Sequence, residues 1–295
     1  METDIFLQEL TVDGGRVAND TDRELQRKVF EVTRKGDLEK FRSLLILKCD
    51  LNCVSNSGKT LLQVAGELKD VCVRNEMIRA LLNGGADLDL ALLHAIRESN
   101  IKTVEILLQF HEAAPQPSPC AVGSLKRQGY VTPLILAACL QNFQIVTRLL
   151  ERGYNIRDPK FSQLSFSSEE MVGEKLGPAV YRLNGFRALS SPVYIAASFL
   201  QDVQSGSDPI HRACVLNKEL RGMAEQEYEF KKEYLELSDG CKEFAVALLN
   251  ECRSMEEIKC VMEKENEDGT LGLNILEFAI STRNEKVCFP YNAFS

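Results

Sequence analysis

The chain has 295 residues, of which 44% are hydrophobic and 26% are charged, and its formal net charge is −8. This composition supplies enough apolar side chains for a long core and excludes a chain that is disordered as a whole. The negative net charge argues against nonspecific binding to nucleic acid or to anionic lipid.

Residues 1–24 are predicted to form an N-terminal tail. The start of the chain is acidic and has no apolar stretch of the kind found in a signal peptide. Further along, the longest apolar run is Val193 to Leu200, far short of the roughly 18 residues of a membrane span. We therefore expect a soluble, cytosolic chain without a direct membrane span, whose ten cysteines remain reduced thiols.

Residues 25–156 repeat a two-helix pattern about four times, and the version from Thr132 to Gly153 is the most complete. The Thr132 hydroxyl can cap a helix, Pro133 suits the first helical position, and Gly153 can end the second helix. Two helices of this size cannot bury their own apolar faces, so neighbouring pairs must stack. This is the pattern of ankyrin repeats. The residues predicted to form the structural repeat core are Leu134, Ala137, Leu149 and Leu150.

The repeats are unevenly spaced. The alanines that mark the first helices, Ala65, Ala95 and Ala137, lie 30 and 42 residues apart, whereas a standard ankyrin repeat has about 33 residues. A loop inserted near Pro115 to Gly129 accounts for the longer interval. After the repeats, residues 157–187 show scattered Ser, Glu and Gly with little helical period, and we predict an irregular insertion there.

Helical patterns resume in residues 188–286. Ser191-Pro192 resembles the Thr-Pro start of a repeat's first helix. A long helix with one buried stripe, which includes Tyr228 and Leu235, is predicted for residues 208–237. Two more helices are predicted for residues 239–252 and 255–264. The fold class predicted for the whole chain is all-α: an ankyrin-repeat α-solenoid followed by linker helices.

No residue cluster predicts catalysis or a bound cofactor. Cys49 with Cys53, and His211 with Cys214, have spacings that zinc could use, but each pair lacks a second pair nearby. Buried thiols in the core are therefore the preferred interpretation. The sequence contains no Gly-rich phosphate loop, nucleophile elbow or zinc-protease helix. We expect a protein that is not an enzyme, with no catalytic site, metal or cofactor.

The order of motifs over residues 25–286 resembles the cytosolic N-terminal region of the short, or C-type, transient receptor potential channels. The most specific motifs are Ser191-Pro192-Val193-Tyr194, and the block that runs from Phe230-Lys231-Lys232-Glu233-Tyr234 to Cys241-Lys242-Glu243-Phe244. The resemblance implies the assembly and regulatory region of a tetrameric, calcium-permeable, nonselective cation channel, located at the cytoplasmic face of the plasma membrane. The implied partners are other C-type subunits. The residues predicted to form a subunit-contact block are Phe230, Tyr234, Cys241 and Phe244.

Two departures from the family qualify this expectation. Many members carry a His-Cys-Cys-Cys zinc cluster in the insertion, but residues 157–187 of this chain contain neither His nor Cys, so no zinc site is implied. Residues 287–295 form a divergent C-terminal tail, which suggests a truncated isoform or an incomplete gene model. The alternative function is a stand-alone ankyrin-repeat adaptor that binds partner proteins through its repeats.

Overall fold

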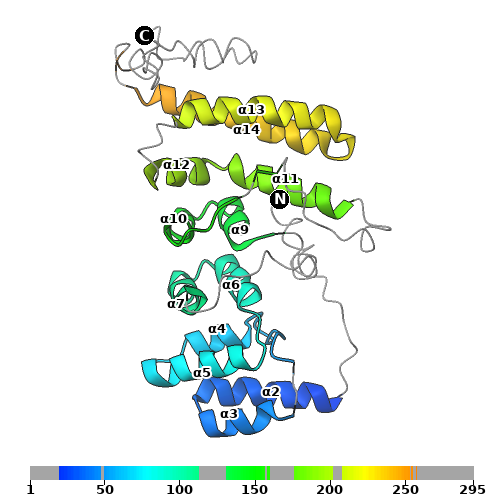
Figure 1. Ribbon diagram of the computed structural model, residues 1–295, viewed down its shortest axis with the longest axis vertical. Coiled ribbons are helices and arrows are strands. Elements are labelled where there is room, and N and C mark those ends of the chain that lie inside the picture. The colour runs from blue at the N-terminus through cyan, green and yellow to red at the C-terminus, as the bar shows by residue number, and fades with distance from the viewer. Residues whose placement is uncertain are drawn as a thin grey trace. The chain divides into compact units, whose positions relative to one another are not determined.

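The computed structural model describes residues 20–47, 50–112, 131–156, 158–159, 176–201 and 208–252, together with Ser254 and Glu257. Their helices are α2 (Asp20–Lys35), α3 (Leu38–Leu45), α4 (Leu61–Gly66), α5 (Val71–Asn83), α6 (Leu88–Arg97), α7 (Ile101–Glu112), α9 (Pro133–Cys139), α10 (Phe143–Glu151), α11 (Leu176–Leu189), α12 (Pro192–Gln201), α13 (Pro209–Gln226), the 3-10 turn η2 (Tyr228–Phe230) and α14 (Lys231–Asn250) (Figure 1). In these ranges the only strand-like pairing is one isolated bridge between Val54 and Thr60. The all-α prediction is confirmed.

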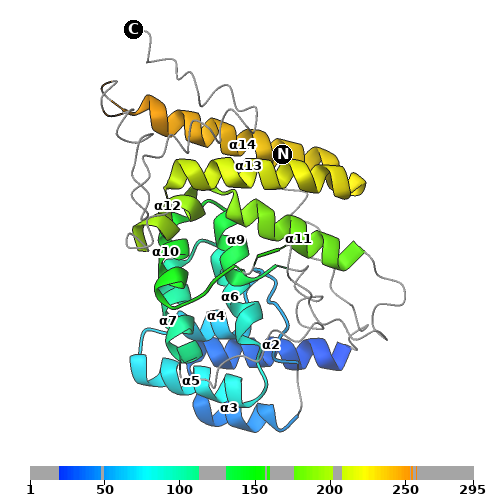
Figure 2. The same ribbon diagram turned by 45° about the horizontal axis from the view of Figure 1, so that its top comes forward.

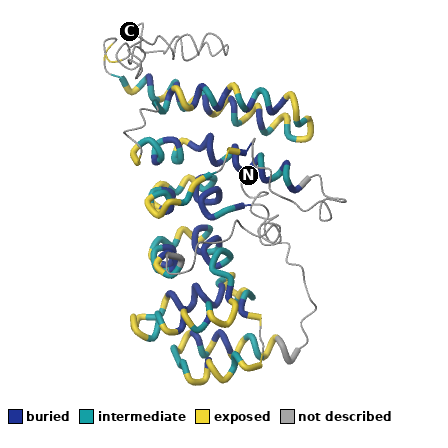
Figure 3. Tube along the Cα trace, in the orientation of Figure 1, coloured by how far each residue is buried: buried dark blue, intermediate teal, exposed yellow. Residues whose placement is uncertain are grey.

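The chain divides into two compact units, Met1–Leu136 and Ala137–Ser295. In the first unit, helices α2 to α7 form three hairpins in which α2 packs on α4, α3 on α5, and α4 on α6 and α7 (Figure 2). All six residues of α4 are buried, whereas α3 buries only Phe41, and Figure 3 shows the same contrast along the two helices. The first helices of the repeats therefore supply most of the core of this unit.

Polar side chains define the ends of these helices. Thr60 and Gln63 form a reciprocal capping box at the start of α4, and Asp37, Asp70 and Asp87 each accept a backbone N–H at the start of the next helix. Each such cap stabilises its helix by about 1 kcal/mol because it satisfies amides that have no partner within the helix. The repeat boundaries are therefore encoded locally.

Successive repeats are also joined through their turns. Gly85 takes a φ of +95°, a left-handed conformation that glycine adopts without steric cost. The Asn52 side chain accepts a hydrogen bond from the Asp87 amide at 2.6 Å and donates one to the Gly85 carbonyl at 3.4 Å. The turn that contains Asn52 is thus hydrogen-bonded to the corresponding turn of the next repeat, which contains Gly85.

In the second unit, α12 packs on α10, and α13 and α14 form a long helical hairpin above α11 and α12 (Figures 1 and 2). Ser191 connects the start of α12 to the preceding repeat. Its hydroxyl donates a hydrogen bond of 2.9 Å to the Ala138 carbonyl and lies 3.3 Å from Gln141 Oε1. Since α10 is a second helix, α12 stacks with the second helices. The prediction that Ser191-Pro192 starts a first helix is therefore wrong.

The predicted irregular insertion, residues 157–187, does not extend to its expected end, because α11 starts at Leu176. Ala179, Tyr181, Leu183, Asn184 and Phe186 are all buried, and these positions point to nearly every side of the helix. A helix buried all round shows no amphipathic period. Residues 160–175 of that segment lie outside the described residues.

Several helix boundaries differ from the predicted ones. Helix α2 starts at Asp20, within the predicted tail of residues 1–24. The helices predicted for residues 208–237 and 239–252 meet at a different point, because α13 ends at Gln226 and α14 runs unbroken from Lys231 to Asn250. The predicted loop at 115–129 and divergent tail at 287–295 fall outside the described residues, as does nearly all of the helix predicted for 255–264.

Candidate protein-interaction site

The predicted repeat-core residues lie on α9 and α10. Leu134, Ala137 and Leu149 are buried, with at most 1% of their surface exposed. Leu150 is only half-buried. Residues 149 and 150 therefore differ although both are leucines, because the helical turn directs one of them toward the core and the other toward its margin.

The predicted subunit-contact block spans η2 and α14, and its four residues divide into two kinds. Tyr234 and Cys241 are core residues, exposed by 0% and 1% respectively. Phe230 and Phe244 are half-buried and pack against the edge of the same hydrophobic cluster. Of these four residues, only the two phenylalanines have surface that a second subunit could contact.

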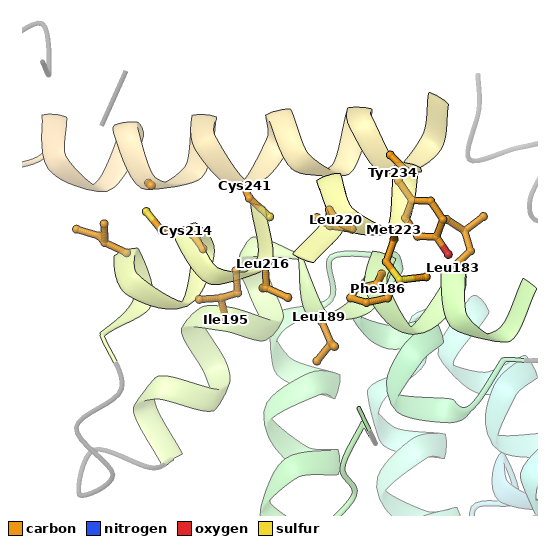
Figure 4. Close-up of a cluster of buried hydrophobic side chains, with 14 of the residues drawn as sticks. Leu183, Phe186, Leu189, Ile195, Cys214, Leu216, Leu220, Met223, Tyr234 and Cys241 are labelled. Atoms are coloured by element: carbon orange, nitrogen blue, oxygen red, sulfur yellow. The ribbon is translucent and has the colours of Figure 1, made fainter. Parts of the chain in front are cut away.

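Tyr234 joins α14 to α11. Its ring meets Phe186 edge-on, with centroids 5.9 Å apart and an interplanar angle of 86°, an arrangement that aromatic quadrupoles favour. Figure 4 shows it pointing from α14 toward Phe186 and Leu183. Burial, and then its hydrogen bond to Glu227, raise the pKa of the Tyr234 phenol. The hydroxyl therefore stays protonated and serves as a donor.

Glu227 is the centre of a polar network at the break between α13 and η2. The Arg182 guanidinium donates to Glu227 Oε1 from two nitrogens, at 2.6 Å and 2.5 Å. Tyr234 Oη donates to the other carboxylate oxygen at 2.8 Å. The Glu227 side chain is 15% exposed, and charge-assisted bonds of this kind are stronger than neutral ones. The network fixes where α13 ends, and so fixes the positions of α11 and α14 around that point.

A groove of about 970 Å³ opens beside this network, along α13 and the Arg182 side chain. The groove is lined by the apolar side chains of Val215 and Met223, by the backbone at Gly222, and by the charged Lys218 and Glu219. A Cβ placed on Gly222 would meet no atom within 4 Å. The surface beside Gly222 is therefore open.

Exposed apolar side chains mark the start of α14. Tyr228 is 77% exposed and Leu235 is 39% exposed, and the Lys231 ammonium lies 5.3 Å from the centre of the Tyr228 ring. The sequence predicted both residues in a buried stripe. That prediction is wrong because the helix breaks at Glu227, which changes the helical register on either side of the break.

Cys241 and Cys214 lie in the interior of the α13–α14 hairpin (Figure 4). Burial raises the pKa of the Cys241 thiol from 9.0 to about 12, and Cys214 adds to this rise. The buried-thiol interpretation is supported for Cys214, while His211 lies on the exposed face of α13. Within the described ranges, no three His, Cys, Asp or Glu side chains are arranged to hold a metal ion.

Cys241 is expected to resist alkylation in the folded chain. Because its pKa is raised, the folded Cys241 thiol keeps its proton at a pH where an unfolded thiol ionises. The contribution of the protonated thiol to the stability of the folded state is therefore complete below pH 9, and it is lost as the pH rises from 9 toward 12. Iodoacetamide at pH 8, followed by peptide mass spectrometry, should label the exposed Cys72 long before Cys241. Denaturant should equalise the two rates. Equal labelling in the native state would contradict the buried position.

Comparison with known proteins identifies both parts of the chain. Residues 70–160 match the family described as ankyrin repeats in three copies, and residues 168–231 match the family described as transient receptor ion channel II. The chain combines ankyrin repeats with a transient receptor ion channel II region. The channel II match covers α11, α12, α13 and η2, together with the first residue of α14.

Similar proteins carry transient receptor potential names. Human short transient receptor potential channel 4 is 29% identical over 259 residues, which cover 83% of this chain. The transient receptor potential-gamma protein of Drosophila melanogaster is 32% identical over 285 residues, or 88% of this chain. The transient-receptor-potential-like protein of Caenorhabditis elegans is 28% identical over 257 residues, or 83%. These matches confirm the resemblance to the N-terminal region of the short transient receptor potential channels.

The chain spans about a quarter of the length of these relatives, 24% to 25%. In the part of the chain that the structure describes, no helix has the length and apolar character needed to cross a bilayer. Among these relatives, the human protein is named a channel. The channel II region and the helices that complete its core are therefore the candidate interaction site.

Proposed function

We propose that the chain is the cytosolic assembly and regulatory region of a calcium-permeable, nonselective cation channel subunit, and that it acts at the cytoplasmic face of the plasma membrane. In this role its linker helices contact other C-type subunits, and its ankyrin repeats bind further protein partners. The observation that carries the proposal is the channel II match over residues 168–231. An ankyrin protein of another kind has no reason to contain this region.

The proposed subunit contact lies on the outer side of η2 and α14. Tyr228 and Leu235 offer exposed apolar surface, and the half-buried Phe230 and Phe244 border the core behind them. Aromatic side chains are frequent anchors of protein interfaces because they bury a large area at small entropic cost. Tyr234 and Glu227 support this surface from within.

A stand-alone adaptor is the alternative, and one feature of the first unit favours it. A groove of about 370 Å³ between α3 and α5 is lined by the apolar Leu45 and Ala80, by Arg42 and Arg79, and by Glu76, which lies 4.0 Å from Arg42. Ile46, next to the groove in sequence, is 80% exposed. An apolar side chain with a carboxylate beside it on a partner would complement this groove, with the carboxylate facing Arg79, because Arg42 already lies beside Glu76.

The test is co-expression with a full-length C-type subunit from the same organism. The chain is expected to co-precipitate with that subunit and to reduce its calcium entry, because it occupies contacts that full-length subunits use. Leu235→Glu should weaken both effects without changing the melting temperature, since Leu235 is partly exposed. Leu200→Glu is the matched control, because Leu200 is 61% exposed but lies on α12.

Two outcomes would count against the channel proposal. If the parent chain neither associates nor changes calcium entry, the adaptor becomes the better function, and Arg42→Glu with Arg79→Glu should then abolish capture of the adaptor's partner. If Leu200→Glu weakens association as much as Leu235→Glu does, the contact does not lie on α14.

A further inference from the structure

Asn217 is a polar residue in the interior of the α13–α14 hairpin. Its side chain is 0% exposed, and its Nδ2 donates a hydrogen bond of 3.0 Å to the Ser238 carbonyl. Asn217 Oδ1 and Ser238 Oγ are buried as well, and neither has a hydrogen-bond partner among the described residues. Residues of the hydrophobic cluster flank both positions. Leu220 lies close to Asn217 on α13, and Cys241 lies close to Ser238 on α14.

This contact is not an efficient way to stabilise the hairpin. A buried amide or hydroxyl without a full set of hydrogen bonds is destabilising relative to an apolar side chain of similar size. Leucine at position 217 would bury apolar surface and remove the unsatisfied Asn217 Oδ1. The presence of asparagine therefore calls for another reason.

The breadth of the buried face of α13 supplies that reason. Its buried residues are Ile210, Ala213, Cys214, Leu216, Asn217, Leu220, Met223 and Ala224. At about 100° per residue these positions cover roughly half of the helix circumference, because α13 packs against α12 as well as against α14. Because apolar residues continue around this whole face, hydrophobic contact alone does not specify which of them is turned toward α14.

The hydrogen bond to Ser238 removes that ambiguity. Asn217 lies within the wide face, and its amide can reach the α14 backbone only when that part of the face is turned toward α14. Ser238 has a small side chain, whereas Tyr234 and Lys242, one turn away on either side, are bulky. A single buried asparagine is known to fix the arrangement of paired helices at a cost in stability.

We propose that the Asn217–Ser238 contact fixes the rotational setting of α13 against α14. The setting matters beyond the hairpin because Glu227 follows the last turn of α13 directly and must meet both Arg182 and Tyr234. It also determines the direction in which η2 presents Tyr228.

The test compares Asn217→Leu with Leu220→Ala in the full chain. Asn217→Leu is expected to keep or raise the melting temperature, because it removes the unsatisfied Asn217 Oδ1 from the core and adds buried apolar surface. It should also speed alkylation of Cys214 about tenfold, and speed amide exchange across residues 208–230, because several settings of α13 become populated. Leu220→Ala should lower the melting temperature, with Cys214 alkylation rising only as far as that loss of stability requires.

Ser238→Ala provides a second measurement that does not depend on the fold of the leucine variant. The contact uses the backbone carbonyl of residue 238, so this variant should retain the parent's slow Cys214 alkylation and melt at or above the parent temperature. The proposal is overturned if Asn217→Leu melts as low as Leu220→Ala, or if it melts like the parent while Cys214 alkylation and amide exchange stay at parent rates. Fast Cys214 alkylation in Ser238→Ala would also overturn it.

Discussion

Replacing Tyr234 with alanine is expected to lower the free energy of unfolding of the unit Ala137–Ser295 by about 3–5 kcal/mol. Tyr234 has no exposed surface, so its loss leaves a cavity between α14 and α11. The edge-on contact with Phe186 is lost as well, and Glu227 loses the donor at 2.8 Å. Native proteins are stable by only about 5–15 kcal/mol, so this loss removes a large share of the unit's stability.

Two tyrosine controls separate the causes of this loss. Tyr234→Phe removes only the hydrogen bond to Glu227 and should lower the free energy of unfolding by about 1 kcal/mol. Tyr228→Ala alters a side chain that is 77% exposed, and should change stability by less than about 0.5 kcal/mol. Urea unfolding monitored by circular dichroism gives all three values. If Tyr234→Ala unfolds at the parent midpoint, Tyr234 does not occupy the core.

The ankyrin part of the fold was predictable because its signals are local and recur along the chain. Thr60 and Asp87 are capping residues that act within three positions of themselves, and such short-range chemistry can be read from residue types alone. The repetition of the pattern then indicated stacking, because a single hairpin cannot bury its own apolar face.

Helix α11 could not be predicted in this way. Its buried residues surround the axis, so apolar and polar positions do not alternate with a helical period. What stabilises it is its environment: α12 and α14 pack against it, and both lie later in the chain. A helix whose whole surface is covered by distant segments carries little sequence evidence of its own.

The break at Glu227 was missed for a related reason. Its position is fixed by Arg182, which lies 45 residues earlier in the sequence, and by Tyr234. Nothing in the residues around 227 indicates such a distant ion pair. The same error placed Tyr228 and Leu235 in the core, although both are exposed. Resemblance to the channels identified the right segment, but only the structure separates its interior residues from its surface residues.

Replacing Leu149 with alanine is expected to lower the free energy of unfolding by about 2–5 kcal/mol, through lost burial and the cavity that remains. Leu149 has no exposed surface, and α10, on which it lies, packs on α12. The loss should therefore spread through the second unit and lower its cooperative melting temperature.

Leu150→Ala is the matched control, because it makes the same chemical change at the next position. Leu150 is half-buried, so its replacement should lower stability by only about 1 kcal/mol. Thermal melts of the two variants, followed by circular dichroism, give the comparison. Equal losses would show that both leucines lie between stacked hairpins, as the repeat pattern alone predicts. A larger loss for Leu149 supports the asymmetric packing of α10, in which one member of the Leu-Leu pair enters the core and the other covers its edge.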